Sequence, residues 1–420
     1  MTASLAAGLE PCVHCGFCLQ SCPTYLVTGD ESDSPRGRIV LLQGLSAGRI
    51  DPRDQALTKH LDRCLGCLAC EPVCPSGVSY GPALERARHL LTRTRGIPLS
   101  VRLVHTVMAE RRLGQLLFPV ARAARWAAGL FAGRSRFGLA LGMLAATRPT
   151  RPDTNGKRSP PATDAGYRGT KPAGRAVVLR GCIMDGLFSH VHRATERVLS
   201  ANGFELVEAP AQVCCGALHT HAGQHDEALA LTRRNVAAFD ALDDDTVIVA
   251  NAAGCGAMLK EYGRHLAGDP LARRAEALAA RVRDVSEVLV ERGPRRGASL
   301  GLRVAYDPPC HLLHAQGVAR EPVAMLDAVD GIERVGHEDA DLCCGSAGSY
   351  SLAQPALSGA VLTRKIETLL AAQPDVVATG NPGCAMQIGA GLLAAGESIP
   401  VVHPVEILDW SYERAGFYAG

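Results

Sequence analysis

The chain has 420 residues, of which 47% are hydrophobic, and its formal net charge is +2. This length is sufficient for roughly two or three domains with cores of their own. The near-neutral charge excludes a general attraction to nucleic acid, so we expect no nucleic-acid partner. Because no uninterrupted apolar stretch reaches about 18 residues, we also predict no transmembrane helix.

Two copies of one cysteine pattern lie in the N-terminal part of the chain. Both have the form C-x2-C-x2-C-x3-C-P, which is the cluster-binding run of two-cluster bacterial ferredoxins. The first copy comprises Cys12, Cys15, Cys18 and Cys22 followed by Pro23, and the second comprises Cys64, Cys67, Cys70 and Cys74 followed by Pro75. Two such runs in one chain predict two [4Fe–4S] clusters.

The spacing also predicts which cysteines share a cluster. In these runs three closely spaced cysteines bind one cluster and the fourth binds the other. We therefore expect a first-run group of Cys12, Cys15, Cys18 and Cys74, and a second-run group of Cys64, Cys67, Cys70 and Cys22. Disulfides are not expected, since residues 1–10 lack the basic and apolar regions of a secretory leader. Structural zinc usually needs two C-x2-C pairs set well apart. The thiols favour a reducing, cytoplasmic location.

Residues 1–95 are expected to form an α-helical domain around these runs. Helix-like stretches at 39–45, 55–62 and 83–92 favour this over a compact β-rich ferredoxin. Between the runs, Pro35–Arg38 is predicted as a basic turn. Its arginines either offset the negative charge of a cluster and its thiolates or belong to an ordinary solvated turn.

Residues 96–148 change in character, because arginines alternate with Leu, Val, Ala and Phe at helical spacing. A basic amphipathic helical segment is typical of a membrane-surface or partner-binding element. The alternative is a helical cap on the neighbouring domain. The arginines are Arg102, Arg111, Arg112, Arg122, Arg125, Arg134, Arg136 and Arg148. Residues 149–174, rich in Pro, Gly, Thr and Lys, are predicted as a flexible linker.

Residues 175–299 and 300–420 are two copies of one repeat. In each copy a short apolar strand ends near a cysteine, Cys-Cys-Gly follows, and another strand leads into Gly-Cys. Strand–helix alternation predicts α/β domains with cysteines at the strand ends, where open α/β sheets place ligands. The predicted strands are Val177–Leu179, Val247–Ala250, Val304–Tyr306 and Val376–Ala378. The predicted fold class is α+β multidomain: an N-terminal α-helical ferredoxin domain with two [4Fe–4S] clusters, then two α/β Cys-Cys-Gly repeat domains.

Each repeat supplies four cysteines that can bind one metal centre. They are Cys182, Cys214, Cys215 and Cys255 (the first tetrad) and Cys310, Cys343, Cys344 and Cys384 (the second tetrad). Repetition of the whole spacing argues against a set of small buried hydrophobes. An iron–sulfur cluster and zinc are both compatible with four thiolates. We interpret the nearby His219, His221, His311 and His314 as hydrogen-bonded loop histidines rather than ligands or proton carriers.

Together these motifs resemble the iron–sulfur subunits that partner flavin-dependent dehydrogenases, and in particular the glycolate oxidase (glycolate dehydrogenase) iron–sulfur subunits. The resemblance covers nearly the whole chain, apart from the arginine-rich segment and the linker. It is carried by Ser34–Ile39, Cys64–Val78, Cys214–Gly223, Asp307–His311 and Cys343–Gly348.

The resemblance implies an electron-transfer role, with no catalytic residue on this chain. The sequence contains no dinucleotide-binding or phosphate-loop motif, so an FAD is expected on a partner subunit. The resemblance implies that this flavin oxidises glycolate to glyoxylate, and that this chain relays the electrons to a membrane acceptor such as quinone. The arginine-rich segment would then hold the complex at the inner face of the cytoplasmic membrane.

Several alternatives stay open at this level. The substrate of the complex can be another 2-hydroxy acid such as lactate, or glycerol 3-phosphate. The repeats can instead reduce disulfides, as in heterodisulfide reductase, or bind zinc as a scaffold. Some relatives end each repeat with C-x-x-C, whereas Ala252 and Asn381 replace the first of those cysteines here. This departure argues against disulfide reduction and against a non-cubane cluster, and leaves a four-cysteine cluster, zinc or an empty site.

Overall fold

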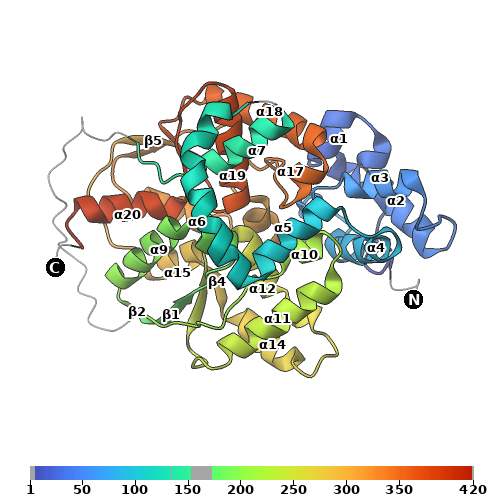
Figure 1. The fold of residues 1–420 in the computed structure, drawn as a ribbon, viewed down its shortest axis with the longest axis horizontal. Helices are drawn as coiled ribbons and strands as arrows, with labels where there is room; N and C mark the ends of the chain where they lie inside the picture. The colour runs from blue at the N-terminus through green and yellow to red at the C-terminus, as the bar shows by residue number, and fades with distance from the viewer. Residues whose placement is uncertain (1–4, 134, 153–172, 419–420) are drawn as a thin grey trace.

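The computed structural model describes residues 5–133, 135–152 and 173–418 (Figure 1). A helical N-terminal part lies at one end of the molecule, and two four-stranded parallel sheets with their helices form the rest. This architecture confirms the predicted fold class. Most of the predicted linker, residues 153–172, lies outside the described residues, as does Arg134. Among the described helices, none is long and apolar enough to cross a membrane.

The N-terminal part is built from short helices around a small leucine-rich core. Its second helix starts four residues earlier than we expected. Ser34 is the N-cap, its side chain accepts a hydrogen bond from the Gly37 backbone N–H, and Pro35 occupies the first turn. The prediction of a basic turn at Pro35–Arg38 is therefore wrong. The helices are α1 (Pro23–Thr28), α2 (Pro35–Ser46), α3 (Gln55–Asp62) and α4 (Tyr80–Arg95), with 3-10 turns at Phe17–Leu19 and Glu31–Asp33.

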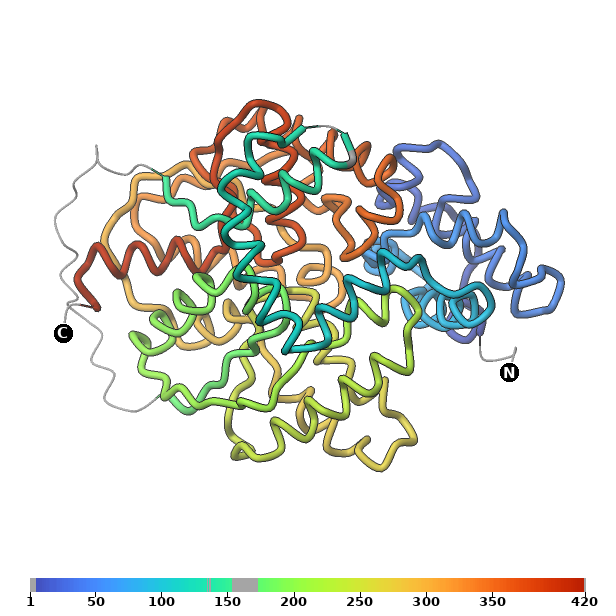
Figure 2. The backbone as a smooth tube through the Cα atoms, viewed as in Figure 1, coloured from blue at the N-terminus to red at the C-terminus, as the bar shows by residue number. Residues whose placement is uncertain are grey.

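The arginine-rich segment folds into three helices that run from the N-terminal part across both repeats (Figure 2). They are α5 (Leu99–Ala109), α6 (Arg111–Ala128) and α7 (Arg136–Ala145). Helix α6 packs on α8 of the first repeat, and α7 packs on α19 of the second. The approach of α7 to α19 is close because glycines line it: a Cβ on Gly142 would lie 3.1 Å from the Cβ of Ala390. The segment thus covers the repeats in the way expected of a helical cap.

The first repeat is a parallel sheet with strand order β2-β1-β3-β4 and helices between the strands. Its strands are short runs of mostly buried apolar residues, as is typical of parallel sheets covered on both faces. Its elements are β1 (Gly174–Val178), α8 (Ile183–Leu187), α9 (Ser189–Ala201), β2 (Phe204–Leu206), α10 (Ala217–His221), α11 (His225–Phe239), β3 (Val247–Ala250), α12 (Ala253–Lys260), α13 (Tyr262–His265), α14 (Ala272–Ala280), β4 (Val282–Asp284) and α15 (Val285–Arg292).

The second repeat has the equivalent strand order, β6-β5-β7-β8, again all parallel. All four predicted strands are present, although β1 and β5 each begin before the predicted residue. The elements are β5 (Leu302–Tyr306), a π-helical turn at His311–Ala315, α16 (Glu321–Asp327), β6 (Ile332–Arg334), α17 (Tyr350–Ala353), α18 (Pro355–Ala371), β7 (Val376–Ala378), α19 (Pro382–Ala394), β8 (Val401–Val402) and α20 (Pro404–Arg414).

The two repeats share one hydrophobic core. It contains buried residues of both sheets, including Val249 from β3 and Val376 from β7. Helix α9 of the first repeat packs against α20 of the second, and α15 packs against α16. Arg197 on α9 and the buried Asp409 on α20 form a two-point ion pair, with Nε–Oδ1 at 2.9 Å. Helix α9 in the first repeat corresponds to α16 in the second, and α15 corresponds to α20. The α9–α20 and α15–α16 contacts are therefore related by the internal symmetry of the two repeats.

Candidate metal centres

The second run of cysteines forms a buried group that Cys22 joins. Cys64 follows α3, and the Gly66 backbone N–H lies 3.4 Å from its sulfur. Cys22 is the N-cap of α1 and is buried. Burial raises the pKa of the Cys70 thiol well above its ordinary value, and the charges of Cys67, Cys64 and Cys22 add to this effect. The four members of the predicted second-run group are thus close enough to interact electrostatically.

The first run surrounds a separate hollow nearer to solvent. Cys12, Cys15, Cys18 and Cys74 all line this hollow, and Cys70 borders it. Cys15 is exposed, whereas Cys22 and Cys64 of the second-run group are buried and Cys67 and Cys70 are partly buried. Arg36 reaches the rim, donating to the His14 carbonyl at 3.3 Å and pairing with Glu31 at 2.6 Å. The structure therefore brings Cys74 to the first run and Cys22 to the second, although both are distant in sequence from those partners.

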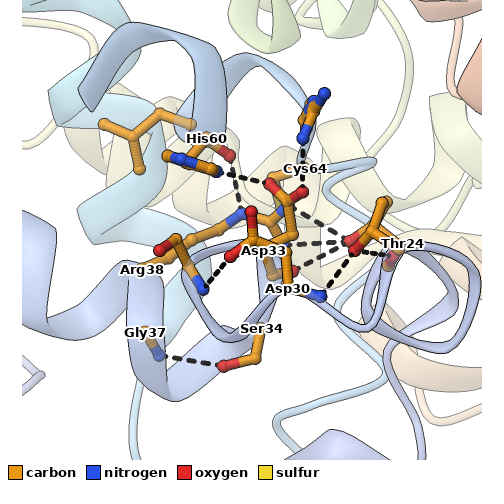
Figure 3. A network of polar contacts seen from close by, with 12 residues as sticks. Thr24, Asp30, Asp33, Ser34, Gly37, Arg38, His60 and Cys64 are labelled. Atoms are coloured by element: carbon orange, nitrogen blue, oxygen red, sulfur yellow. Dashed lines mark hydrogen bonds and ion pairs between the residues drawn. The ribbon is translucent and has the colours of Figure 1, made fainter. Parts of the chain in front are cut away.

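Arg38 is the charged centre of a buried polar network beside the second-run group (Figure 3). Its Nε donates to the His60 carbonyl at 2.8 Å, and its two terminal nitrogens lie 3.1 Å from Thr24 Oγ1. One of these nitrogens is 3.9 Å from the Cys22 sulfur. The Asp33 carboxylate is 3.6 Å from the guanidinium and also contacts Arg63 and His60.

This network changes the protonation of the thiols beside it. Burial alone would lower the pKa of Arg38. Its pKa is nevertheless raised above the ordinary value by the nearby negative groups, which are Cys64, Tyr80, Cys22 and Asp33. Burial alone would raise the pKa of Cys64, yet the charges of Arg38 and Arg88 lower it below its ordinary value. Arg38 therefore favours the thiolate form, which is the form that binds iron.

The second-run group lies directly against the second repeat. Leu65 and Cys67 pack with Cys310, Cys343 and Tyr350 in one apolar cluster. After burial, the charge of Cys310 is the largest contribution that raises the pKa of Cys67. The Tyr350 hydroxyl donates to the backbone carbonyl that follows α3, that of Arg63, at 2.8 Å. Nothing in the local cysteine spacing indicates this contact.

Each tetrad lies at the carboxyl ends of its parallel strands, as predicted. In the first tetrad the Cys182 and Cys214 sulfurs are 3.5 Å apart, and those of Cys215 and Cys255 are 3.3 Å apart. The glycine after each Cys-Cys pair is left-handed, with φ of 91° at Gly216 and 87° at Gly345, a conformation that glycine adopts without steric cost. In the second tetrad, hydrogen bonding from Cys343 and the neighbouring His311 holds the pKa of Cys310 well below its ordinary value despite burial.

The sulfur spacing shows how closely the thiols of each cysteine set converge. Four sulfurs around one zinc lie roughly 3.8 Å apart, because Zn–S bonds are about 2.3 Å and tetrahedral. Over the described residues, no three cysteine sulfurs lie within 4.8 Å of one another; the one such group of metal-ligating types is Asp30, Asp33 and His60. Two arginines already pair with Asp33 in that group. The close sulfur pairs of the first tetrad show that its thiols converge, an arrangement that suits either zinc or an iron–sulfur cluster.

Asn381, at the position of the absent cysteine in the second repeat, has two contacts. Its Nδ2 lies 3.5 Å from the Cys384 sulfur, and its Oδ1 accepts from the Gly254 backbone N–H at 3.3 Å. The Ala253 N–H also donates to the Gly380 carbonyl at 3.0 Å. The asparagine thus connects the second tetrad to the helix that carries Cys255 of the first.

The two tetrads differ in the charge beneath them. Asp307 and Lys365, both buried, form an ion pair at 2.7 Å next to the second tetrad. At the equivalent positions of the first repeat the chain has Leu179 and Val236. Burial raises the pKa of Asp307 to about 7, against the opposing effect of Lys365. Lys365 thus places a positive charge near Cys343 and Cys344 that the first tetrad lacks.

The four predicted loop histidines lie in helical turns instead. His219 and His221 belong to α10, and His311 and His314 to the π-helical turn after Cys310. His311 Nδ1 lies 3.5 Å from the Cys310 sulfur, and its ring centroid is 5.1 Å from that of His221. The loop assignment failed because both turns are short and follow directly on cysteine motifs, without the periodicity that marks longer helices.

Comparison with protein families agrees with this geometry. A family model described as "4Fe-4S dicluster domain" matches residues 8–78, and one described as "Cysteine-rich domain" matches residues 176–260 and 304–389. The N-terminal part accordingly carries 4Fe–4S clusters, and the cysteine-rich repeats fit additional iron–sulfur centres. Fold and cysteine geometry together define an iron–sulfur electron-transfer protein.

Curated relatives specify the family. The probable glycolate oxidase iron-sulfur subunit of Bacillus subtilis is 37% identical, over 96% of this chain and 94% of that protein. The glycolate oxidase iron-sulfur subunit of Escherichia coli is 33% identical, over 97% and 95%. A subunit of the fumarate reductase (CoM/CoB) of Methanothermobacter marburgensis is 29% identical, over 96% of this chain and 72% of its own. The chain belongs to the family of glycolate oxidase iron–sulfur subunits, which confirms the resemblance inferred from its motifs.

Removing the charge of Arg38 should lower the reduction potential of the second-run centre. A buried positive charge stabilises the more negative, reduced state, so we expect Arg38→Gln to lower the midpoint by about 60 mV, which is roughly 1.4 kcal/mol for one electron. A potentiometric titration followed by electron paramagnetic resonance (EPR) measures this shift. Arg38→Lys keeps the charge and should recover most of it. Arg36→Gln, beside the first-run group, is the matched control, and an equal shift of the same centre in that variant would contradict the assignment.

Proposed function

We propose that this chain is the electron-transfer subunit of a glycolate-oxidising complex. In this proposal FAD on a partner subunit oxidises glycolate to glyoxylate, and the electrons leave through this chain to a membrane acceptor. The observation that carries it is the continuity of the cysteine groups, from the exposed Cys15 through the second-run group to Cys310. Iron–sulfur clusters supply one-electron storage and transfer, and the protein sets their potentials by burial, charge and hydrogen bonds.

We assign the ligands by the groups that the fold assembles. The first-run group would hold one [4Fe–4S] cluster and the second-run group the other. Each tetrad would hold a further iron–sulfur centre, because the repeats match the cysteine-rich family and the second tetrad packs against the second-run group. Around Cys15, Val13 and Phe17 are exposed to 69% and 67%. This apolar rim beside the outermost cysteine group is where the flavin-bearing partner would dock.

The outer face of α5 and α6 supports attachment to a membrane surface. Exposed apolar side chains of α5, α6 and the 3-10 turn that follows α6 accompany the exposed arginines Arg102 and Arg112. A helix face that combines large apolar and basic side chains suits the headgroup region of an anionic membrane. The apolar residues are Leu99, Leu103, Leu113, Leu116, Leu117, Val120, Trp126, Leu130 and Phe131. The complex would therefore be peripheral, at the inner face of the cytoplasmic membrane.

Lactate is the second candidate substrate. The lactate utilization protein A of Geobacillus thermodenitrificans is 32% identical over 54% of this chain and 95% of its own length. Because the substrate binds on the flavin subunit in either case, this chain would have the same relay role. Glycolate is favoured since the relatives named for glycolate oxidase match almost the whole chain.

Anaerobic affinity purification of this chain from its native cell tests the function. We expect the eluate to contain bound flavin and to reduce a dye when glycolate is added. If only lactate caused dye reduction, the complex would oxidise lactate rather than glycolate, and this chain would relay those electrons. Iron without any flavoprotein would contradict the proposal.

Cys22→Ser tests whether the fourth cysteine of the first run binds the cluster of the second run. Because Cys22 lies with the second run, the variant should lose the EPR signal of the second-run centre and keep that of the first. Cys18→Ser, four positions away, should do the opposite. Loss of the first-run signal alone in Cys22→Ser would overturn the assignment.

Leu116→Glu combined with Val120→Glu tests the membrane face. Burying two such side chains is worth about 3–6 kcal/mol, so we expect at least a tenfold loss of binding to vesicles that contain phosphatidylglycerol. Sedimentation with the vesicles measures it. Val40→Glu, an exposed valine of α2, is the control and should leave binding unchanged. Undiminished binding by the double variant would exclude this face.

A further inference from the structure

A cavity of about 800 Å³ lies between α5, α6 and the first repeat, and Cys182 and Cys214 form part of its wall. This size is within the range of small-molecule binding sites. The cavity is bounded by the C-terminal end of α5, one face of α6 and the segment after β2. It therefore offers a ligand direct access to the first tetrad.

The two tetrads are equivalent in the repeat but not in their surroundings. The ferredoxin part covers the second tetrad, where Leu65 and Cys67 pack against Cys310 and Cys343. The first tetrad faces the cavity instead. One tetrad is thus placed to communicate with the N-terminal cysteine groups, and the other is placed to contact a bound molecule.

The lining of the cavity specifies the chemistry of that molecule. Apolar walls come from Val107, Met108, Phe118, Leu206 and Val213. Basic and acidic side chains are close to balance, with Arg111, Arg122, Arg180 and Arg193 against Asp185, Glu196 and Glu208. This balance disfavours a strongly anionic ligand, and the mixture of apolar and polar walls suits a neutral molecule that combines an apolar body with hydrogen-bond acceptors.

Of the four cavity arginines, Arg193 is exposed and donates to the Ser189 hydroxyl at 3.5 Å, and two others have closer partners. Arg180 pairs with Glu196 at 2.7 Å, and Arg111 donates to the Pro210 carbonyl at 2.8 Å. In the described part of the chain no acidic side chain pairs with Arg122, which is half-buried on the cavity side of α6. Gln115 lies two turns before it on the same helix.

Helix α6 is also the wall between the cavity and the outer apolar face. Gln115, Phe118 and Arg122 line the cavity, with Gln115 also exposed to solvent, whereas the exposed Leu113, Leu116 and Val120 do not line it. At 3.6 residues per turn these two sets lie on different sides of the helix. A molecule that dissolves in the membrane would therefore reach the cavity by passing one helix.

We propose that this cavity binds the headgroup of an isoprenoid quinone, with Arg122 and Gln115 as donors to a quinone carbonyl. The inference rests on the proposed function, because it names the membrane acceptor of that relay. Reduction of the quinone to the quinol takes two electrons, supplied by the flavin-bearing partner as it oxidises its substrate, and two protons, supplied by solvent.

Photolabelling of the full, iron-loaded chain with a short-chain azidoquinone tests the site. We expect crosslinks in α6 or in residues 206–214, and competition by decylubiquinone. In equilibrium binding with radiolabelled decylubiquinone, Gln115→Trp should fill the cavity, and Arg122→Leu should remove a charged donor. Each should weaken binding at least tenfold. Arg273→Leu, an exposed arginine of α14 that does not line the cavity, is the matched control and should bind like the unchanged chain. Iron content and circular dichroism verify that each variant is folded.

The outcomes separate this inference from the relay function. Crosslinks elsewhere, or unchanged binding in both cavity variants, would overturn the quinone site even if the purified complex still reduces dye with glycolate. Displacement of the label by a small organic disulfide such as cystamine, and not by decylubiquinone, would also overturn it and assign the cavity to disulfide chemistry. Loss of quinone binding in the two cavity variants alone would establish it, whichever hydroxy acid the partner oxidises.

Discussion

The central constraint on this molecule is the burial of thiolate charge, and Arg38 is the residue that meets it in the N-terminal part. Its guanidinium lies under Cys22 and beside Cys64, where water cannot screen the sulfurs. An unpaired charge at such depth would cost several kcal/mol, and Asp33, Arg63 and His60 complete a network in which each charge has a partner. The position of α2 follows from this requirement, because that helix carries Arg38 to the ends of α1 and α3.

The charge of the buried thiolates meets different surroundings in each repeat. Each tetrad has a histidine beside it, His219 at Cys214 and His311 at Cys310. The second tetrad also has the charge of Lys365, whereas the first repeat has Leu179 and Val236 at the equivalent positions and a cavity beside its cysteines. A positive charge favours the reduced state of a neighbouring redox centre, so two tetrads of nearly identical cysteine spacing are placed in unequal electrostatic fields. Duplication supplied the ligands, and the residues around them make the two sites distinct.

The fold class, the repeat strands and the family could be predicted because each has a local signature: cysteine spacing, short apolar strands, Cys-Cys-Gly. The start of α2 could have been found as well, since Ser34 followed by Pro35 is a helix N-terminal signal that the interpretation as a turn overlooked. Two features could not be predicted from the sequence: the packing of Cys67 against Cys310 and the cavity beside Cys182. Both bring together segments that are far apart in the chain. No periodicity along the chain encodes such contacts.

The shared core of the repeats has a consequence for how the protein is made. Helix α20, at the end of the described chain, packs on α9, and the ion pair between Arg197 and Asp409 joins them. During synthesis the first repeat therefore keeps an apolar face uncovered until α20 leaves the ribosome. The first repeat reaches its final packing only then, so the unfinished chain has to be protected from aggregation until that point.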